Sequence, residues 1–294
     1  MIDHRVLQVG VVVVTYYPSP RMLFASVRQC CAQAAETIVV DNTDDLGAIS
    51  EVKAIVDKAN EEGWRVQLHQ FGSNKGIAAA QNVGAHYLAA KGCTHILELD
   101  QDSFVPDGYI ATMLNGFLAL ESDGQKVLGV GPRTCDEGET PIAAVGECRV
   151  VDKTLSSGFL YSVSALQLVG GKEEGLFIDL VDWEWCWRAA SVGYSVFQNR
   201  SASIGHSSGE GTVAFLGLRV GKSRPVRIYY QYRNMTRMLV RGYVPLRRKL
   251  YMVGSMAFRL LAYVSVFSER GARVGMALKG VFDGIRGVQS ASHL

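Results

Sequence analysis

The sequence lacks the features of a secreted, disulfide-stapled or repeat protein. Its six cysteines show no C-x-x-C spacing, and a chain of 294 residues seldom depends on a disulfide framework, so we expect reduced thiols in the cytosol. At the N-terminus, Asp3, His4 and Arg5 lead into an apolar run that lasts only from Val9 to Val14, which does not fit a signal peptide. Internal repeats and low-complexity segments are also absent. A hydrophobic content of 48% instead predicts a globular protein with a substantial core.

Two common nucleotide-binding signatures are missing as well. The segment Gly72-Ser73-Asn74-Lys75-Gly76 precedes a predicted helix, but it lacks the Gly-Lys-Ser/Thr order of a nucleoside-triphosphate loop. The first predicted strand is not followed by G-x-G-x-x-G. The sequence therefore predicts neither ATPase nor dinucleotide-dependent chemistry. We expect the glycine and asparagine of this segment to let the backbone approach a ligand at a helix N-terminus.

Acidic residues are nearly absent from the C-terminal quarter of the chain. Residues 219–294 hold 15 Lys/Arg but only Glu269 and Asp283, a net charge of +13. Residues 1–218 hold 15 Lys/Arg and 26 Asp/Glu, a net charge of −11. A basic tail on an acidic body predicts a polyanionic partner or surface, such as nucleic acid, phosphate or anionic lipid.

The first hundred residues alternate apolar runs with helical patterns. Strands are predicted at Val9–Val14, Thr37–Val40, Val66–His69 and Thr94–Leu99, and helices at 19–34, 46–62 and 76–90. This alternation predicts an α/β fold with a mostly parallel central sheet flanked by helices. Three strands end at polar groups, namely Thr15, Asp41 and Asp100. Since ligands bind at the carboxyl ends of such strands, we expect these residues to cluster in a site.

The second half of the chain has a mixed pattern. Residues 131–149 are rich in turn-forming residues, Leu155–Leu160 is predicted to be a strand, and a helix is predicted over 181–192. A further apolar helix is predicted over Leu246–Val266, but four basic residues interrupt it, and a membrane span needs about 20 mostly apolar residues. Two interpretations stay open: this helix lies on anionic lipid, or it packs on the rest of the protein.

Two aspartates one residue apart follow a predicted buried strand, in Asp100-Gln101-Asp102. Carboxylates with this spacing can share a hard divalent cation, which accepts water and substrate phosphates as its other ligands. Such a cation would neutralise charge on a departing diphosphate. The alternative is a pair of solvated loop aspartates, but the position at the end of a buried strand favours a metal site.

A second acidic group begins the predicted helix over 181–192. Asp179, Asp182 and Glu184 lie among apolar residues and the tryptophans Trp183, Trp185 and Trp187. Carboxylates at a helix N-terminus can serve as simple caps. In so apolar a setting, however, they are costly, which favours a carboxylate that removes a proton from an acceptor hydroxyl group.

Two other groups of residues are weaker candidates. His206 lies between glycine and serine residues and could reach a metal ion, although a lone histidine is more often structural. An arginine–tyrosine cluster could bind phosphate through arginine or bind single-stranded nucleic acid through stacking, and the acidic body disfavours nucleic acid. The members of this cluster are Arg224, Arg227, Tyr229, Tyr230, Tyr232, Arg233 and Asn234.

Taken together, these motifs resemble those of the inverting family 2 glycosyltransferases of the GT-A fold, and among them the bacterial rhamnosyltransferases. The resemblance extends from residue 9 to about residue 240. The matching stretches are Val11–Pro18, Val39–Asn42, Asn74–Gly84, Leu99–Ser103, Phe177–Arg188 and Tyr229–Asn234.

The resemblance implies a role for each matching residue. Thr15 and Asp41 would contact the base and ribose of the sugar nucleotide, with Tyr17 nearby, and Asn74, Gly76 and Asn82 would line the same pocket. Asp100, Gln101 and Arg233 are further substrate-binding candidates, and Trp183 would shape the acceptor pocket. Asp102 would bind Mg²⁺ or Mn²⁺, with His206 completing the metal site. Asp182 would be the catalytic base, supported by Glu184 and Arg188.

The implied reaction is transfer of L-rhamnose from dTDP-β-L-rhamnose to a hydroxyl group of a cell-surface polysaccharide such as the O-antigen of lipopolysaccharide. Alternatives are a family 2 enzyme that uses UDP-galactose or UDP-N-acetylglucosamine, a non-catalytic binding protein, and an RNA-binding protein. We expect residues 1–240 to form the catalytic domain and residues 241–294 a basic helical region. This region is predicted to dock on the inner membrane surface, near a lipid-diphosphate-linked acceptor, or to form an oligomer interface.

Overall fold

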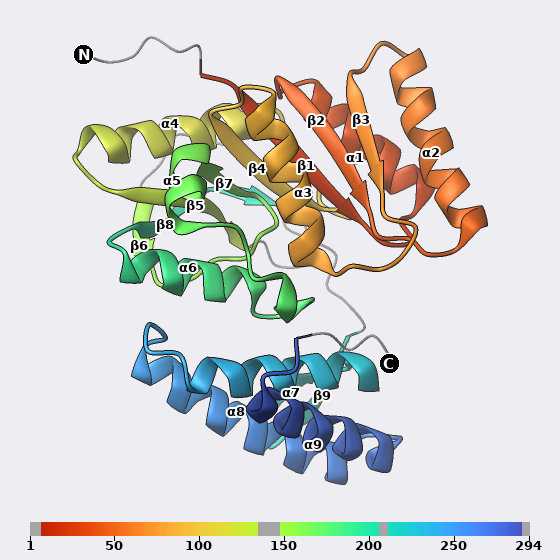
Figure 1. Cartoon of the computed structure of the whole chain (residues 1–294), viewed down its shortest axis with the longest axis vertical. Coiled ribbons are helices and arrows are strands. Elements are labelled where there is room, and N and C mark those ends of the chain that lie inside the picture. The colour runs from red at the N-terminus through yellow and green to blue at the C-terminus, as the bar shows by residue number, and fades with distance from the viewer. Residues whose placement is uncertain (1–6, 135–147, 206–210, 290–294) are drawn as a thin grey trace.

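The computed structural model describes residues 7–134, 148–205 and 211–289. Figure 1 shows an upper α/β body and a lower layer of helices. The body contains an eight-stranded sheet in the order β3-β2-β1-β4-β7-β5-β8-β6. Its strands are β1 (Val9–Thr15), β2 (Glu36–Asp41), β3 (Val66–Gln70), β4 (His95–Asp100), β5 (Val127–Thr134), β6 (Cys148–Val151), β7 (Phe159–Ser162) and β8 (Ser195–Ile204).

The helices of the body cover both faces of this sheet. They are α1 (Pro20–Cys31), α2 (Leu46–Glu61), α3 (Ile77–Ala90), α4 (Tyr109–Ser122), α5 (Val163–Val169) and α6 (Val181–Ser191), with a short 3₁₀ turn, η1 (Glu174–Leu176). In β1, Val11 and Val13 pack with α1, α2 and α4, whereas Val12 and Val14 pack with α3, α5 and α6. This alternation explains why the strand is apolar throughout, since side chains on both of its faces are buried.

The predicted α/β fold is confirmed. Strands β1, β2, β3 and β4 are parallel to one another, and β5 is parallel to β8. In this sheet β7 runs antiparallel to β4 and β5, and β6 runs antiparallel to β8. Each strand and helix predicted in the first hundred residues is present, with ends that differ by at most a few residues.

The strand predicted at Leu155–Leu160 is wrong in its position. The strand in this region is β7 (Phe159–Ser162), and residues 155–158 form a loop and a turn. The main-chain amide of Ser156 donates to Asp182 and its carbonyl group accepts from Phe159, so these groups are used outside a strand ladder, and the Ser157 hydroxyl group contacts the turn after β4. This correction matters because it places a loop, and not a strand, beside Asp182.

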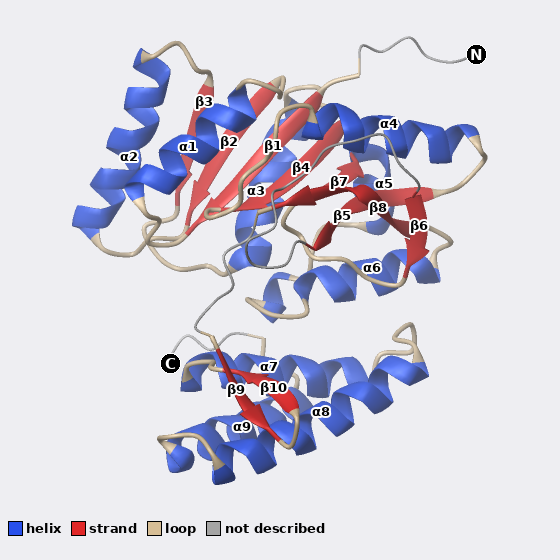
Figure 2. Cartoon of the chain, turned by 180° about the vertical axis from the view of Figure 1, so that it is seen from behind, coloured by secondary structure: helices blue, strands red, loops and turns tan. Residues whose placement is uncertain are grey.

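The lower layer is formed by α7 (Pro225–Leu239), α8 (Leu246–Ser265), α9 (Arg270–Arg286) and a hairpin of β9 (Thr212–Phe215) and β10 (Leu218–Gly221). Figures 1 and 2 show α7 nearest to the body, with α8 and α9 farther from the sheet. Helix α9 packs closely on α7 because Gly280 and Gly284 lack side chains. A Cβ atom on Gly280 would lie 2.5 Å from the carbonyl oxygen of Tyr229, and one on Gly284 would lie 2.7 Å from that of Arg233.

The helix predicted at Leu246–Val266 is confirmed as α8. None of the helices in the described parts of the chain is long and apolar enough to cross a bilayer. The predicted division into residues 1–240 and 241–294 stays a prediction.

Candidate active site

The predicted clustering of Thr15, Asp41 and Asp100 follows from the register of the sheet. Thr15 pairs with Asp41, and Val14 pairs with Asp100, so the carboxyl ends of three strands meet at one edge. The Thr15 hydroxyl group donates a hydrogen bond of 2.7 Å to Oδ1 of Asp41, which also accepts one of 2.7 Å from Thr43. The other carboxylate oxygen of Asp41, Oδ2, is buried and has no hydrogen-bond partner among the described residues. Such an oxygen is ready to accept a hydrogen bond from a ligand.

Hydrogen bonds of Tyr17 and Gln101 connect neighbouring loops at this edge. Oε1 of Gln101 accepts a hydrogen bond of 2.7 Å from the main-chain amide of Tyr16. The Tyr17 hydroxyl group donates a hydrogen bond of 2.5 Å to Asp44, and this bond raises the pKa of Tyr17 to about 12. The loop after β1 is thereby connected to the loops after β2 and β4.

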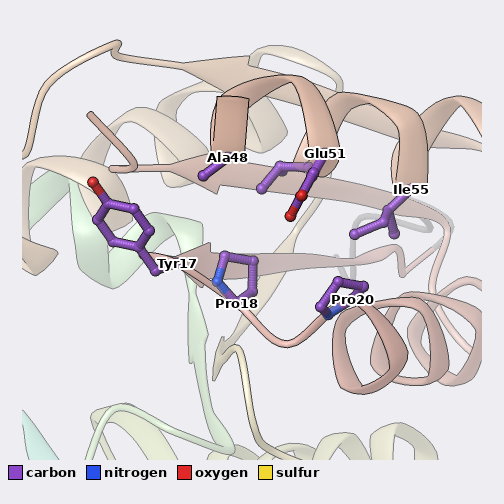
Figure 3. Close-up of a pocket in the computed structure, with 7 residues that line it drawn as sticks. Tyr17, Pro18, Pro20, Ala48, Glu51 and Ile55 are labelled. Atoms are coloured by element: carbon purple, nitrogen blue, oxygen red, sulfur yellow. The ribbon is translucent and has the colours of Figure 1, made fainter. Parts of the chain in front are cut away.

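Tyr17 also lines a pocket of about 180 Å³ between the loop after β1 and helix α2 (Figure 3). In Figure 3, the Tyr17 ring lies at one end of the pocket, Pro18 and Pro20 form its floor, and Ala48, Glu51 and Ile55 extend from α2. The aspartates of the candidate site are not among the residues that line it. The pocket is therefore beside the predicted nucleotide site and separate from its carboxylates.

Asn74 and Gly76 come just before α3, and Asn82 lies within this helix. Oδ1 of Asn74 accepts a hydrogen bond of 3.0 Å from the amide of Gly76. The left-handed backbone of Gly76 contacts Phe177, because a Cβ atom there would lie 2.6 Å from its carbonyl oxygen. Asn82 is buried, and its side chain bonds both main-chain groups of Lys172 at 2.9 Å. The described contacts of Gly76 and Asn82 join α3 to the segment before α6, and their ligand-binding role stays a prediction.

The Asp100–Asp102 turn is fixed by two serines. Ser157 accepts a hydrogen bond of 3.3 Å from the amide of Asp100, and its hydroxyl group lies 2.6 Å from that of Ser103. Gly205 forms a bridge with Phe104 next to this turn. His206, the predicted second metal ligand, lies outside the described residues.

Asp182 adjoins the same turn through the loop before β7. Its Oδ2 accepts a hydrogen bond of 3.2 Å from the amide of Ser156, the neighbour of Ser157. Burial raises the pKa of the Asp182 carboxyl group from 3.8 to about 6, Lys172 opposes this shift, and the charge of Asp100 adds to it. A carboxylate with this pKa is mostly ionised at neutral pH and is basic enough to accept a proton.

Two lysines near Asp182 were not predicted from the sequence. Lys172 is buried, forms an ion pair with Glu98 and lies over the rings of Tyr161 and Trp185. Lys153 lies over the ring of Trp183, with its Nζ 2.9 Å from the ring centroid. Burial is the main cause that lowers the pKa of Lys153, to about 8. No local pattern marks either lysine, because both reach Asp182 only through the tertiary fold.

Glu184 and Arg188 form a pair behind the predicted base. The Glu184 side chain is fully buried, and its two oxygens accept hydrogen bonds of 2.8 and 3.0 Å from Arg188. Glu184 also accepts one of 2.7 Å from Tyr243, which lies between α7 and α8. Arg188 in turn donates to the carbonyl groups of Val169 and Gly171. These contacts support a role in positioning α6 and Lys172, so direct participation in catalysis stays a prediction.

The segment that leads into α6 has an unusual backbone. Phe177, Asp179 and Leu180 have φ angles of 65°, 62° and 66°, in the left-handed region that residues with side chains seldom adopt. The buried Asn234 amide group stabilises the segment by donating to the carbonyl groups of residues 176, 178 and 179 at 2.8–2.9 Å. Helix α7 therefore holds the strained residues immediately before Asp182.

Arg233 takes part in the same contact and is fully buried. Its guanidinium group donates to the carbonyl groups of Gly175 and Leu176 at 2.7 and 3.0 Å, and to the side chain of Asn234. These contacts with carbonyl groups and with Asn234 support a positioning role for Arg233, and its substrate contact stays a prediction.

The described residues fit a divalent cation only in part. Asp100 and Asp102 supply two carboxylates at the end of β4, but no group of three or more possible ligands occurs within the described ranges. Mg²⁺ and Mn²⁺ accept such a small protein contribution where substrate phosphates and water complete the ligand set. The donor set therefore suits a cation that binds together with a diphosphate.

Comparisons with known proteins find a similar family model and a similar enzyme. Residues 11–139 match the family model described as Glycosyl transferase family 2. The chain is 29% identical over 297 residues to the dTDP-rhamnosyl transferase RfbF of Shigella flexneri, a match that covers 94% of this chain and 95% of that protein.

Solved structures show a similar fold. GalNAc-T7 with UDP, GalNAc and Mn²⁺ matches with a TM-score of 0.59 at 13% identity, over 97% of this chain and 57% of that one. The mannosyltransferase PcManGT from Pyrobaculum calidifontis, in complex with GDP-Man and Mn²⁺, matches with a TM-score of 0.56 at 12% identity, over 95% of this chain and 87% of that one. Our chain thus spans little more than half the length of GalNAc-T7. Residues 11–139 are therefore similar to glycosyl transferase family 2, the chain has a GT-A fold, and the similarities together support a glycosyltransferase.

Proposed function

We propose that the protein is an inverting rhamnosyltransferase that moves L-rhamnose from dTDP-β-L-rhamnose to a hydroxyl group of a cell-surface saccharide such as O-antigen. The similarity to the dTDP-rhamnosyl transferase RfbF over 94% of this chain supports the choice of sugar donor. The observation that carries the mechanism is the loop of Ser156 and Ser157, which binds Asp182 with one residue and the Asp100–Ser103 turn with the next. A base and a diphosphate site that adjoin each other are what a single displacement needs.

In this mechanism Asp182 accepts the proton of the acceptor hydroxyl group. The acceptor oxygen forms a bond to the anomeric carbon from the face opposite the diphosphate, and the bond from that carbon to the phosphate oxygen breaks. The product is an α-L-rhamnoside with inverted configuration, and dTDP leaves. The raised pKa of Asp182 supports this role, because a more basic carboxylate removes a proton more readily.

Asp100 and Asp102 would bind the diphosphate through a shared divalent cation. When bound, Mg²⁺ or Mn²⁺ supplies positive charge that stabilises the leaving diphosphate. Thr15 and Asp41 would bind the base and ribose, and the unpartnered Oδ2 of Asp41 supports this assignment. Trp183 would contact the acceptor, and Lys153 over its ring makes the same region cationic.

A second candidate is a family 2 enzyme that uses a UDP-sugar, since GalNAc-T7 was solved with UDP. Hydrolysis of dTDP-β-L-rhamnose, UDP-galactose and UDP-N-acetylglucosamine without acceptor separates the candidates. We expect release of dTDP alone, and we expect a chelator to stop it and Mn²⁺ to restore it. Faster cleavage of a UDP-sugar would refute the rhamnose donor, and full activity in the chelator would refute the metal role.

The proposal includes a location and partners. We propose a cytoplasmic protein that associates peripherally with the inner face of the cell membrane, where a lipid-diphosphate-linked saccharide acceptor would be available. The basic composition of residues 219–294 supports an anionic surface as the partner. Nucleic acid is not proposed as a partner.

A further inference from the structure

Helix α8 presents an apolar stripe to solvent. The large side chains of the stripe are well exposed, from 70% for Leu246 and 66% for Leu250 to 45% for Val264. Its members recur every three or four residues along 20 residues of helix, and none is charged: Leu246, Leu250, Val253, Ala257, Leu261 and Val264. The buried residues Met252, Ala262 and Tyr263 lie on the opposite side. An ordinary surface helix has the reverse arrangement, with its polar side toward solvent.

Helix α9 has a similar but shorter apolar face. Leu278, Phe282 and Ile285 are 58%, 53% and 74% exposed, and they share one side of the helix. Lys279 and Arg286 are exposed beside them, and the guanidinium group of Arg286 lies 3.9 Å from the centroid of the Phe282 ring. Apolar and cationic groups are therefore adjacent on this helix.

Basic groups predominate around these faces. Of the acidic residues, residues 219–294 contain only Glu269 and Asp283, and Asp283 accepts a hydrogen bond of 2.9 Å from Tyr229. Arg247, which flanks the α8 stripe, is 71% exposed at its side chain and shares the carboxylate of Asp152 with Arg248. A second copy of this chain would bring the same basic groups together, and like charges oppose that contact. An anionic surface attracts them instead.

We propose that α8 and α9 form a docking surface for an anionic lipid bilayer. The apolar faces enter the boundary between headgroups and acyl chains, and Arg247, Lys279 and Arg286 contact lipid phosphates. Helices α8 and α9 lie on the far side of α7 from the sheet in both views of the molecule (Figures 1 and 2). This proposal rests on the membrane association in the proposed function, and it assigns that association to particular residues.

The test is co-sedimentation of the full chain with vesicles of phosphatidylglycerol and phosphatidylcholine, compared with vesicles of phosphatidylcholine alone. The test variant is Leu250→Glu/Leu261→Glu. The matched control is Leu46→Glu/Leu168→Glu, which adds the same charge at leucines that are 82% and 73% exposed on α2 and α5 of the body. All four positions are exposed, so neither variant should unfold the protein.

We expect wild-type binding to be at least about tenfold stronger on the anionic vesicles, and we expect the test variant to lose that binding while the control keeps it within about twofold. Equal loss in both variants, binding that ignores phosphatidylglycerol, or a dimer that only the test variant dissociates would overturn the proposal. Donor hydrolysis is measured on the same samples. Because it needs no membrane, a vesicle result against docking leaves glycosyl transfer standing, and absent hydrolysis with intact docking counts against glycosyl transfer alone.

Discussion

The main-chain amide of Ser156 donates a hydrogen bond of 3.2 Å to Oδ2 of Asp182. This contact fixes the predicted base beside the loop that binds the Asp100–Ser103 turn through Ser157. Asp182 is buried at this position, and burial is the main cause of its raised pKa.

The first prediction concerns pH. Burial raises the pKa of Asp182 to about 6, so the carboxylate is ionised above this pH and protonated below it. Because only the ionised form accepts a proton, donor hydrolysis should fall about tenfold for each pH unit below 6. The measurement is the initial rate of dTDP release between pH 4.5 and 8, and a rate that stays level down to about pH 4.5 would contradict a base with this pKa.

Asp41 provides a test of the nucleotide site. Asp41→Asn should weaken dTDP binding about tenfold. In one orientation of the new side chain, an NH2 group replaces the unpartnered acceptor Oδ2; in the other, the NH2 group faces the Thr15 hydroxyl group, which would then have to accept the hydrogen bond that it now donates. The control is Asp44→Asn, an exposed neighbour that bonds Tyr17. Calorimetric titration with dTDP measures both variants, and equal affinities would exclude Asp41 from the site.

Asn234 tests whether α7 positions the base. Asn234→Ala removes one amide group that donates to three carbonyl groups before α6, so we expect a fall of about tenfold in the rate of donor hydrolysis with little change in dTDP affinity. Gln231→Ala is the control, because Gln231 lies on the same helix and bonds Ser223 and Arg259 instead.

The pH range over which the rate of donor hydrolysis falls, the acid limb of the rate profile, distinguishes a positioning role of Asn234 from a general loss of stability. If the segment relaxes, Asp182 gains solvent and its limb should move to lower pH in Asn234→Ala. Should the two variants lose the same activity and the same melting temperature, with no movement of the limb, the positioning role is wrong.

The Glu184–Arg188 pair should contribute to stability. Arg188→Leu leaves the fully buried Glu184 carboxylate without its main partner, so we expect the free energy of unfolding to fall by about 3–5 kcal/mol. Lys53→Leu is the control: it breaks a pair of the same i,i+4 spacing with Asp57, but both side chains are more than half exposed, so the cost should stay below about 1 kcal/mol. Urea denaturation measures the free energy of unfolding of both variants. A similar decrease in the two would contradict a larger contribution from the buried Glu184–Arg188 pair.

The sequence was enough to predict the edge of the sheet at which the candidate site lies. A β-branched run such as Val9–Val14 marks a strand buried on both faces, and parallel strands bring Thr15, Asp41 and Asp100 to one edge whatever the details of packing. The helix that begins near Asp182 was also predicted, because an acidic first turn and the following apolar pattern are local signals.

Contacts between distant segments could not be predicted in this way. Lys153 and Lys172 carry no local motif, and the fold alone brings them to Asp182. The basic and aromatic sequence around Arg233 predicted a phosphate contact but not the burial of this residue. That burial depends on tertiary packing, because Gly280 and Gly284 let α9 approach α7 at that point.

The most direct test of the central claim is the release of dTDP from dTDP-β-L-rhamnose by wild type and by Asp182→Asn, with dTDP affinity measured in parallel. The exchange keeps the size of the side chain and leaves one oxygen to accept from the main-chain amide of Ser156 or of Trp183, but it removes the ability to take a proton. We predict that the hydrolysis rate falls at least about a hundredfold while the affinity for dTDP stays within about twofold. A variant that releases dTDP at the wild-type rate would contradict the assignment of Asp182 as the base.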